Sequence, residues 1–126
     1  TKNIKLENSF DKGYKDNILY HQLDFSSEVS INEFIHYLEG LDSIDVLINN
    51  AGVNKINPIA DIPDKEWDWI NNVNLRGPFL LTKVISKKMK NKNSGKIINI
   101  SSIFGVVSKE KRAAYSSTKW GLIGLT

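Results

Sequence analysis

The sequence predicts an α/β fold in which helices cover both faces of a parallel sheet. Short apolar runs of strand length alternate with longer segments in which apolar residues recur at helical spacing. Polar residues follow each strand-like run, and in open parallel sheets ligands bind beyond the carboxyl ends of the strands. We expect a doubly wound sheet in the order strand, helix, strand, helix, strand, helix, with its site at that edge.

The first predicted strand and helix occupy residues 17–40. Residues 17–24 form a short run that reads as a strand and ends at Asp24, where polar side chains can cap the following helix. Across residues 29–38 apolar side chains recur at helical spacing, and Gly40 ends the pattern.

The second predicted strand precedes a long helix. Residues 44–48 form a compact apolar run, which is typical of a buried parallel strand. We expect a sharp turn at residues 49–52 and a loop at residues 53–63. Asp64 is the predicted N-cap of the long helix, whose helical spacing continues to Met89.

The long helix is expected to kink. Pro78 interrupts it, and proline lacks a backbone donor and clashes with the carbonyl four residues earlier, here that of Asn74. The segment ends at Gly95, and residues 96–101 predict another buried strand. After a loop, a helix is expected from Ala113 to the end of the sequence.

The composition excludes several classes of function. The 126 residues are 40% hydrophobic and 25% charged, as in globular proteins. There is no cysteine, so thiolate chemistry is excluded, and neither His21 nor His36 has a metal-binding pattern. No apolar run reaches the roughly 18 residues that span a bilayer, and no signal-peptide core is present. We expect a cytoplasmic protein without metal or membrane partners.

A nucleic-acid partner is not expected either. The net charge is only +3, and no aromatic residues interleave with the clustered lysines to form a stacking surface. The lysines lie near the expected end of the long helix, where cations complement the helix dipole. They are Lys87, Lys88, Lys90, Lys92 and Lys96.

Ser102, Tyr115 and Lys119 form the candidate catalytic pattern. Ser102 follows the strand at residues 96–101, and Tyr115 and Lys119 are four positions apart, so they project from one helix face about one turn apart. A nearby ammonium group favours the ionised form of a phenol, which makes tyrosine a better proton shuttle at neutral pH. The pattern therefore indicates acid–base chemistry.

Four ordered segments carry a resemblance to a known family. They are Asn49-Asn50-Ala51-Gly52, Asn74 within Val-Asn-Leu-Arg-Gly-Pro-Phe, Ile98-Asn99-Ile100-Ser101-Ser102, and Tyr115-Ser116-Ser117-Thr118-Lys119. Their order and spacing resemble the short-chain dehydrogenase/reductase family, particularly its 3-oxoacyl-carrier-protein reductase-like members. The resemblance implies an NAD(P)-dependent oxidoreductase that interconverts a carbonyl and an alcohol by hydride transfer.

The resemblance implies a role for each residue of the pattern. Tyr115 would be the general acid that protonates a carbonyl oxygen in reduction, or the base in alcohol oxidation. Lys119 would support Tyr115 and hydrogen-bond the nicotinamide ribose, while Ser102 would donate to the substrate oxygen. Asn74 would hold a water that continues a proton relay to solvent.

The implied cofactor is NAD or NADP. Asn50, Ala51 and Gly52 would line its adenosine side, with Ala51 and Gly52 allowing close approach of the backbone. Asp24, followed by Phe25, matches the family position that accepts a hydrogen bond from the adenine amino group. The alternative role for Asp24 is a helix N-cap.

By comparison with the family, residues 1–126 form only part of a Rossmann-type domain. The sequence lacks the Gly-rich turn that cradles the cofactor pyrophosphate. We expect an incomplete sheet without its first two strands and its C-terminal strands, so that the strand at residues 17–24 has no neighbour. The chain would be a central fragment of a homo-oligomeric parent (dimer or tetramer), and alone it would bind cofactor poorly.

Other interpretations of single residues remain open. Tyr115 and Lys119 could be an exposed helical pair, Ser102 a turn residue, and Asn74 a group that satisfies the backbone at the kink. A serine hydrolase or Ser-Lys acyl transferase is disfavoured, because a G-x-S-x-G elbow and a nearby histidine are missing. The alternative function is an inactive remnant or interaction module with the same partial fold.

The loop at residues 103–112 is expected to contact the substrate. Its basic residues Lys109, Lys111 and Arg112 permit an anionic or carrier-linked substrate, although solvated loop charges explain them equally well. A small-molecule or carrier-linked carbonyl or alcohol fits the pattern, such as a 3-oxoacyl thioester, a sugar or a polyol.

Overall fold

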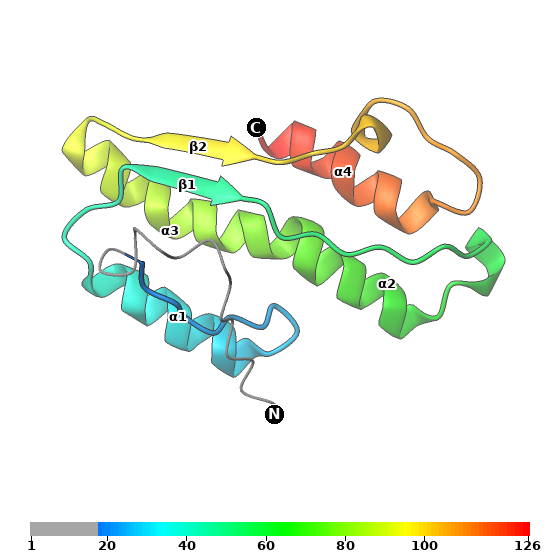
Figure 1. The fold of residues 1–126 in the computed structure, drawn as a ribbon, viewed down its shortest axis with the longest axis horizontal. Coiled ribbons are helices and arrows are strands. Elements are labelled where there is room, and N and C mark those ends of the chain that lie inside the picture. The colour runs from blue at the N-terminus through cyan, green and yellow to red at the C-terminus, as the bar shows by residue number, and fades with distance from the viewer. Residues whose placement is uncertain (1–17) are drawn as a thin grey trace.

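The structure, a computed structural model, describes residues 18–126 (Figure 1). In chain order its elements are α1 (Glu28–Gly40), β1 (Val46–Asn49), the 3-10 helix η2 (Ile59–Asp61), α2 (Asp64–Asn71), the π-helix η3 (Asn72–Arg76), α3 (Gly77–Lys92), β2 (Lys96–Asn99), the 3-10 helix η4 (Ile103–Gly105) and α4 (Ala113–Leu125). The alternation of helices with parallel strands confirms the predicted α/β class.

The sheet consists of β1 and β2, which pair in parallel with Val46 opposite Lys96 and Asn49 opposite Asn99. α3 packs against both strands, and α1 packs against α3, an arrangement that can be followed in Figure 1. A two-stranded parallel sheet with crossover helices is the described part of an incomplete Rossmann-type fold, as predicted.

Only one face of the sheet is covered by the described helices. Successive strand residues point to opposite faces, so Leu47 and Ile97 pack on the core, whereas Val46, Ile48 and Ile98 are 47%, 57% and 43% exposed. The predictions of buried strands and of helices on both faces are therefore wrong for residues 18–126. The core cluster consists of Leu38, Leu81, Ile85 and Met89.

The strand predicted at residues 17–24 is wrong over its described part, because residues 18–24 have no regular secondary structure. Asn17 lies outside the described residues. An extended segment gains ladder hydrogen bonds only from a neighbouring strand, and β1 pairs with no described strand except β2. Leu23 and Phe25 pack against the core cluster instead.

α1 forms where the sequence predicts it and is fixed at both ends. The Ser27 side chain caps its start by accepting from the backbone N–H of Ser30 at 3.3 Å. At its end the ammonium of Lys88, on α3, donates to the carbonyls of Glu39 at 2.8 Å and Leu41 at 2.7 Å. These bonds satisfy helix-end carbonyls that lack intrahelical partners.

The long helix contains a π-helical turn at the predicted kink. α2, η3 and α3 follow one another without a break, and Asn74 lies at the centre of η3. The N–H of Gly77 donates to the carbonyl of Asn72, five residues earlier, while Pro78 has no N–H for the carbonyl of Asn74. A π-helical turn accommodates this missing donor.

Two local predictions next to this helix are wrong. Asp64 is the first residue of α2 and not its N-cap; that position belongs to Pro63, whose carbonyl accepts the N–H groups of Glu66 and Trp67. The predicted sharp turn at residues 49–52 is also absent, and the chain leaves β1 without regular structure (Figure 1). The backbone N–H and carbonyl of Val53 bond instead to the side chain of Asn74 in η3.

Candidate active site

A cleft of about 360 Å³ lies at the carboxyl ends of the two strands. Because β1 and β2 are parallel, the segments that follow them meet at one edge, and the first half of α4 closes the third side. The cleft brings Ser102, Tyr115 and Lys119 together, as the sequence predicts. Its lining residues are Asn50, Gly52, Val53, Asn54, Ile100, Ser101, Ser102, Phe104, Tyr115 and Lys119.

Lys119 is buried, with only 3% of its surface exposed. Its ammonium donates to the carbonyl of Ile100 at 2.8 Å and lies 5.7 Å from the centre of the Tyr115 ring. Burial lowers the pKa of Lys119 below its ordinary value of 10.5, because the charged form loses hydration. Because Lys119 is buried, the alternative that Tyr115 and Lys119 form an exposed helical pair is wrong. A charge shielded from water interacts with its neighbours more strongly than the same charge on the surface does.

The ring of Tyr115 contacts a second aromatic residue. Phe104, in η4, meets it edge to face, with 6.2 Å between ring centres and an interplanar angle of 79°. The guanidinium carbon of Arg112 lies 5.7 Å from the centre of the Phe104 ring, within the range of a cation–π contact. Arg112 is thus engaged in supporting Phe104, while Lys109 and Lys111 are exposed.

The two serines after β2 have different environments. The hydroxyl of Ser102 accepts from the backbone N–H of Phe104 at 3.2 Å and caps η4. Ser102 therefore caps η4 and also lines the cleft. The hydroxyl of Ser101 donates to the carbonyl of Lys119 at 2.9 Å, so it ties the strand end to α4.

Asn74 is fully buried beneath the cleft. Its Oδ1 accepts from the N–H of Val53 at 2.8 Å, and its Nδ2 donates to the carbonyl of Val53 at 2.9 Å and to Oγ1 of Thr118 at 3.1 Å. Asn74 thus satisfies backbone groups, although those of Val53 and not of the kink. The sequence reasoning missed Thr118; its position three residues after Tyr115, hence on nearly the same helix face, was the available signal.

Gly52 lies between the two polar groups that the sequence assigns to a proton relay. A Cβ at this position would be 3.5 Å from Nζ of Lys119 and 3.8 Å from Oδ1 of Asn74. The lack of a side chain leaves this space beside both atoms open to a small polar group. The phenol, the ammonium and this open backbone fit the hydroxyl-rich ribose of a nicotinamide nucleotide.

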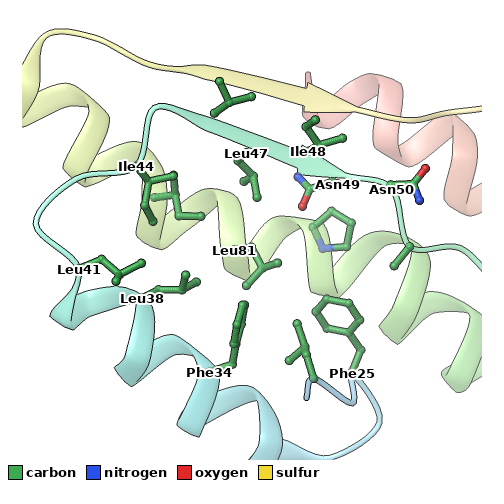
Figure 2. Close-up of a pocket in the computed structure, with 15 residues that line it drawn as sticks. Phe25, Phe34, Leu38, Leu41, Ile44, Leu47, Ile48, Asn49, Asn50 and Leu81 are labelled. Carbon is green, nitrogen blue, oxygen red and sulfur yellow. The ribbon is translucent and has the colours of Figure 1, made fainter. Parts of the chain in front are cut away.

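Three other predicted cofactor residues border a second, apolar cavity of about 410 Å³, here called the groove (Figure 2). Phe25, Asn50 and Ala51 line it, and Asn50 lines the cleft as well. The groove lies between α1, β1 and α3. Its other lining residues are Leu23, Phe34, Leu38, Leu41, Ile44, Val46, Leu47, Ile48, Asn49, Pro78, Leu81 and Ile85.

Asp24 and Phe25 hold the segment before α1 in place. Oδ1 of Asp24 accepts from the N–H of Ser26 at 2.8 Å, and Ser27 is the cap of α1, so the N-cap alternative for Asp24 is wrong. The Phe25 ring packs against Gly77, where a Cβ would come within 2.6 Å of it. Asp24 does not line either cavity, so the predicted adenine contacts are only partly brought together.

A polar network behind the strand ends was not predicted. Nδ2 of Asn49 donates to Oδ1 of Asn99 at 2.8 Å and to Oγ1 of Thr82 at 3.3 Å. Nδ2 of Asn99 in turn donates to Oγ1 of Thr126 at 2.9 Å. These bonds join β1, α3, β2 and the end of α4, and they fix the edge on which the cleft is built.

Within residues 18–126, no cluster of three or more acidic or histidine side chains is placed to bind a metal ion. None of the helices over the same residues combines the length and the apolar character required to cross a bilayer.

Comparison with known proteins identifies the family. The family model for short chain dehydrogenases matches residues 3–126. The chain belongs to this family. A solved structure, "4-hydroxyisoleucine dehydrogenase complexed with NADH", matches with a TM-score of 0.76 and 36% sequence identity over 84% of this chain and 48% of that one. The Rossmann-type fold and the use of NAD(P) within the family agree with the sequence prediction.

Curated relatives give the same assignment. D-beta-hydroxybutyrate dehydrogenase of Cupriavidus necator is 35% identical over 85% of this chain and 42% of its own length. The 3-oxoacyl-[acyl-carrier-protein] reductases of Synechocystis sp. and Aquifex aeolicus are 40% and 38% identical over 71% and 83% of this chain, and over 36% and 43% of theirs. The chain thus spans less than half the length of these oxidoreductases.

Proposed function

We propose that the protein containing this chain is an NAD(P)-dependent oxidoreductase that interconverts a carbonyl and an alcohol. The observation that carries the proposal is the buried ammonium of Lys119 beside the Tyr115 ring, in the same cleft as Ser102. This combination of proton donor, cation and hydroxyl suits a reaction in which charge develops on a single oxygen atom.

In this proposal Tyr115 moves the proton. It donates to the carbonyl oxygen in reduction and accepts from the hydroxyl in oxidation. Ser102 donates a hydrogen bond to the same oxygen, since its hydroxyl accepts from Phe104 N and keeps its own hydrogen available. The nicotinamide, when bound, supplies or accepts the hydride.

Lys119 and Asn74 connect Tyr115 with solvent in this scheme. The ammonium of Lys119 lies 5.7 Å from the centre of the Tyr115 ring and would bond the nicotinamide ribose. Because the amide of Asn74 already bonds Val53 and Thr118, a relay water would use the open space beside Gly52, between Asn74 Oδ1 and Lys119 Nζ. Asn74 therefore acts mainly by fixing the wall of that space.

The cofactor would extend from the cleft past the end of β1. Asn50, Ala51 and Gly52 follow that strand and would line its adenosine side, and Asp24 and Phe25 would approach the adenine. The NADH bound to the matching 4-hydroxyisoleucine dehydrogenase supports NAD or NADP as the cofactor.

We infer a small or carrier-linked 3-oxo or 3-hydroxy compound as substrate. The named substrates of the relatives, a β-hydroxybutyrate and a 3-oxoacyl carrier protein, share this arrangement of oxygen atoms. Lys109 and Lys111, exposed in the segment between η4 and α4, are compatible with an anionic carrier. A homo-oligomeric assembly and a cytoplasmic location stay predictions.

The test uses the whole protein that contains this chain. Acetoacetyl-coenzyme A, a soluble 3-oxoacyl thioester, should be reduced with consumption of NADH or NADPH, and cofactor deuterated at the nicotinamide C4 should label the carbinol carbon of the product. Absence of turnover in both directions with 3-oxoacyl thioesters, sugars and polyols would instead favour the inactive-remnant alternative. The 126-residue chain alone should bind the cofactor poorly.

A further inference from the structure

We propose that Thr118 is a positioning residue, whose hydroxyl holds α4 against η3 so that Tyr115 and Lys119 face the cleft. This inference rests on the proposed function of those two residues. Thr118 is fully buried and does not line the cleft, so it acts through its neighbours.

The hydroxyl of Thr118 joins two parts of the site. Its Oγ1 accepts from Nδ2 of Asn74 at 3.1 Å and donates to the backbone carbonyl of Tyr115 at 2.8 Å. Asn74 continues the connection to the N–H and carbonyl of Val53, which lies beside the cleft. A continuous chain of hydrogen bonds therefore runs from the loop after β1, through η3, to the first turn of α4.

The position of Thr118 on α4 explains how these hydrogen bonds set the orientation of the helix. At about 100° per residue, Thr118 lies about 60° around the helix from Tyr115 and about 100° from Lys119. Gly121, on the same side as Thr118, lets α4 approach η3 closely, because a Cβ there would be 2.9 Å from Cδ2 of Leu75. With Thr118 bonded to η3, rotation of α4 is restricted and Tyr115 and Lys119 point into the cleft.

Removing the hydroxyl would leave one hydrogen of the Asn74 amide without a partner in a fully buried place. Buried polar groups rarely remain unpaired, because their hydration is lost without compensation. The amide would have to turn toward another acceptor, and its bonds to Val53 would weaken. We therefore expect a change in the position of Tyr115 and of the loop wall, and not only a loss of stability.

The test compares Thr118→Val, which keeps the shape but removes the hydroxyl, with Thr118→Ser, which keeps the hydroxyl. Ser117→Ala is the matched control, because Ser117 also bonds a carbonyl three residues earlier, at 2.9 Å, but is exposed. In the protein as its gene encodes it, Thr118→Val should lower kcat about tenfold or more with little change in KM. Thr118→Ser and Ser117→Ala should remain near wild type.

A second readout does not depend on activity. With fluorotyrosine incorporated, the fluorine NMR signal of Tyr115 is identified by its loss in Tyr115→Phe, and it should shift in Thr118→Val but not in Ser117→Ala. If Thr118→Val does not fold, Thr118→Ser against Thr118→Ala isolates the hydroxyl in the same way. A Thr118→Val protein with wild-type kcat and an unshifted signal, even if less stable, would overturn the inference. If wild type has no turnover, the proposed function fails and the NMR signal alone decides the orienting role.

Discussion

The cleft around Tyr115 and the groove beside β1 share Asn50 as a lining residue. They differ in the hydrogen bonding and the exposure of their other lining residues. In the cleft, Lys119, Ser101 and Ser102 each bond a backbone group of a neighbouring element, and no buried side-chain polar atom within residues 18–126 lacks a partner. The groove is lined mostly by apolar side chains, and the Ile48 side chain at its edge is more than half exposed.

The difference separates two parts of the proposed chemistry. The groups proposed to move a proton are held by bonds and contacts with neighbouring described residues, whereas the surfaces expected to lie against a cofactor and further strands remain open. The geometry proposed for proton transfer can therefore form in this chain even if the chain alone binds the cofactor poorly, as we expect.

The largest expected effect lies in the cleft. Tyr115→Phe removes the hydroxyl proposed to transfer the proton but leaves the ring contact with Phe104, so kcat should fall about 10²- to 10⁴-fold while the thermal midpoint changes little. Tyr20→Phe, at an exposed tyrosine, is the control and should retain activity. Steady-state kinetics of the protein as its gene encodes it would contradict the assignment if Tyr115→Phe lost less than about tenfold.

The next effect concerns stability beneath the cleft. Asn74→Ala removes the three hydrogen bonds of a fully buried amide, two of them to the backbone of Val53, so the free energy of unfolding should fall by about 3 kcal/mol. Asn71→Ala, on the same long helix, removes one bond to Trp67 and should cost less than about 1 kcal/mol. Equal losses of unfolding free energy for the two variants, measured by urea unfolding of the 126-residue chain, would show that the buried bonds of Asn74 contribute no more than the bond of Asn71.

A pair of substitutions compares the two faces of β1. Leu47→Thr replaces a side chain that packs on the core and should cost about 2 kcal/mol. Ile48→Thr, at the exposed neighbouring position, should change stability by less than about 0.5 kcal/mol. A similar loss for both, measured by urea unfolding of the 126-residue chain, would mean that the outer face is covered in solution.

The smallest effect is a pH dependence from Lys119. Since burial lowers its pKa, the folded chain releases this proton at lower pH than the unfolded chain does. Between the lowered pKa and 10.5 the unfolded state binds more protons, so stability contributed at this site rises with pH. Lys119→Met should remove that rise, whereas Lys83→Met, at an exposed lysine, should keep it. Parallel stability–pH profiles of wild type and Lys119→Met would contradict the expectation.

The features that the sequence predicted correctly depend on neighbouring residues. The four-residue spacing of Tyr115 and Lys119 is a property of any helix, and the effect of Pro78 on Asn74 acts across a single turn. Placing Ser102 in the same cleft needed only the rule that parallel strands end at one edge.

The features that were missed or mistaken depend on residues far apart. The bond between Asn74 and Thr118 joins positions 44 residues apart, and that between Asn49 and Asn99 joins positions 50 apart; neither can be read from local spacing. The strand predicted at residues 17–24 had a suitable apolar pattern but lacked a partner in the described chain. Strand formation is thus decided by pairing, which the local pattern does not contain.

The π-helical turn of η3 also changes the phase of the long helix. One extra residue in a turn rotates everything after it by about 100° relative to an uninterrupted α-helix. α2, with Ile70 buried, packs against α4, whereas α3 directs Leu81 and Ile85 toward α1 and the strands. The single inserted position lets one continuous helix present its apolar stripe to two different partners. An insertion or a deletion within residues 72–76 should therefore turn the apolar stripe of α2 or of α3 away from its partner.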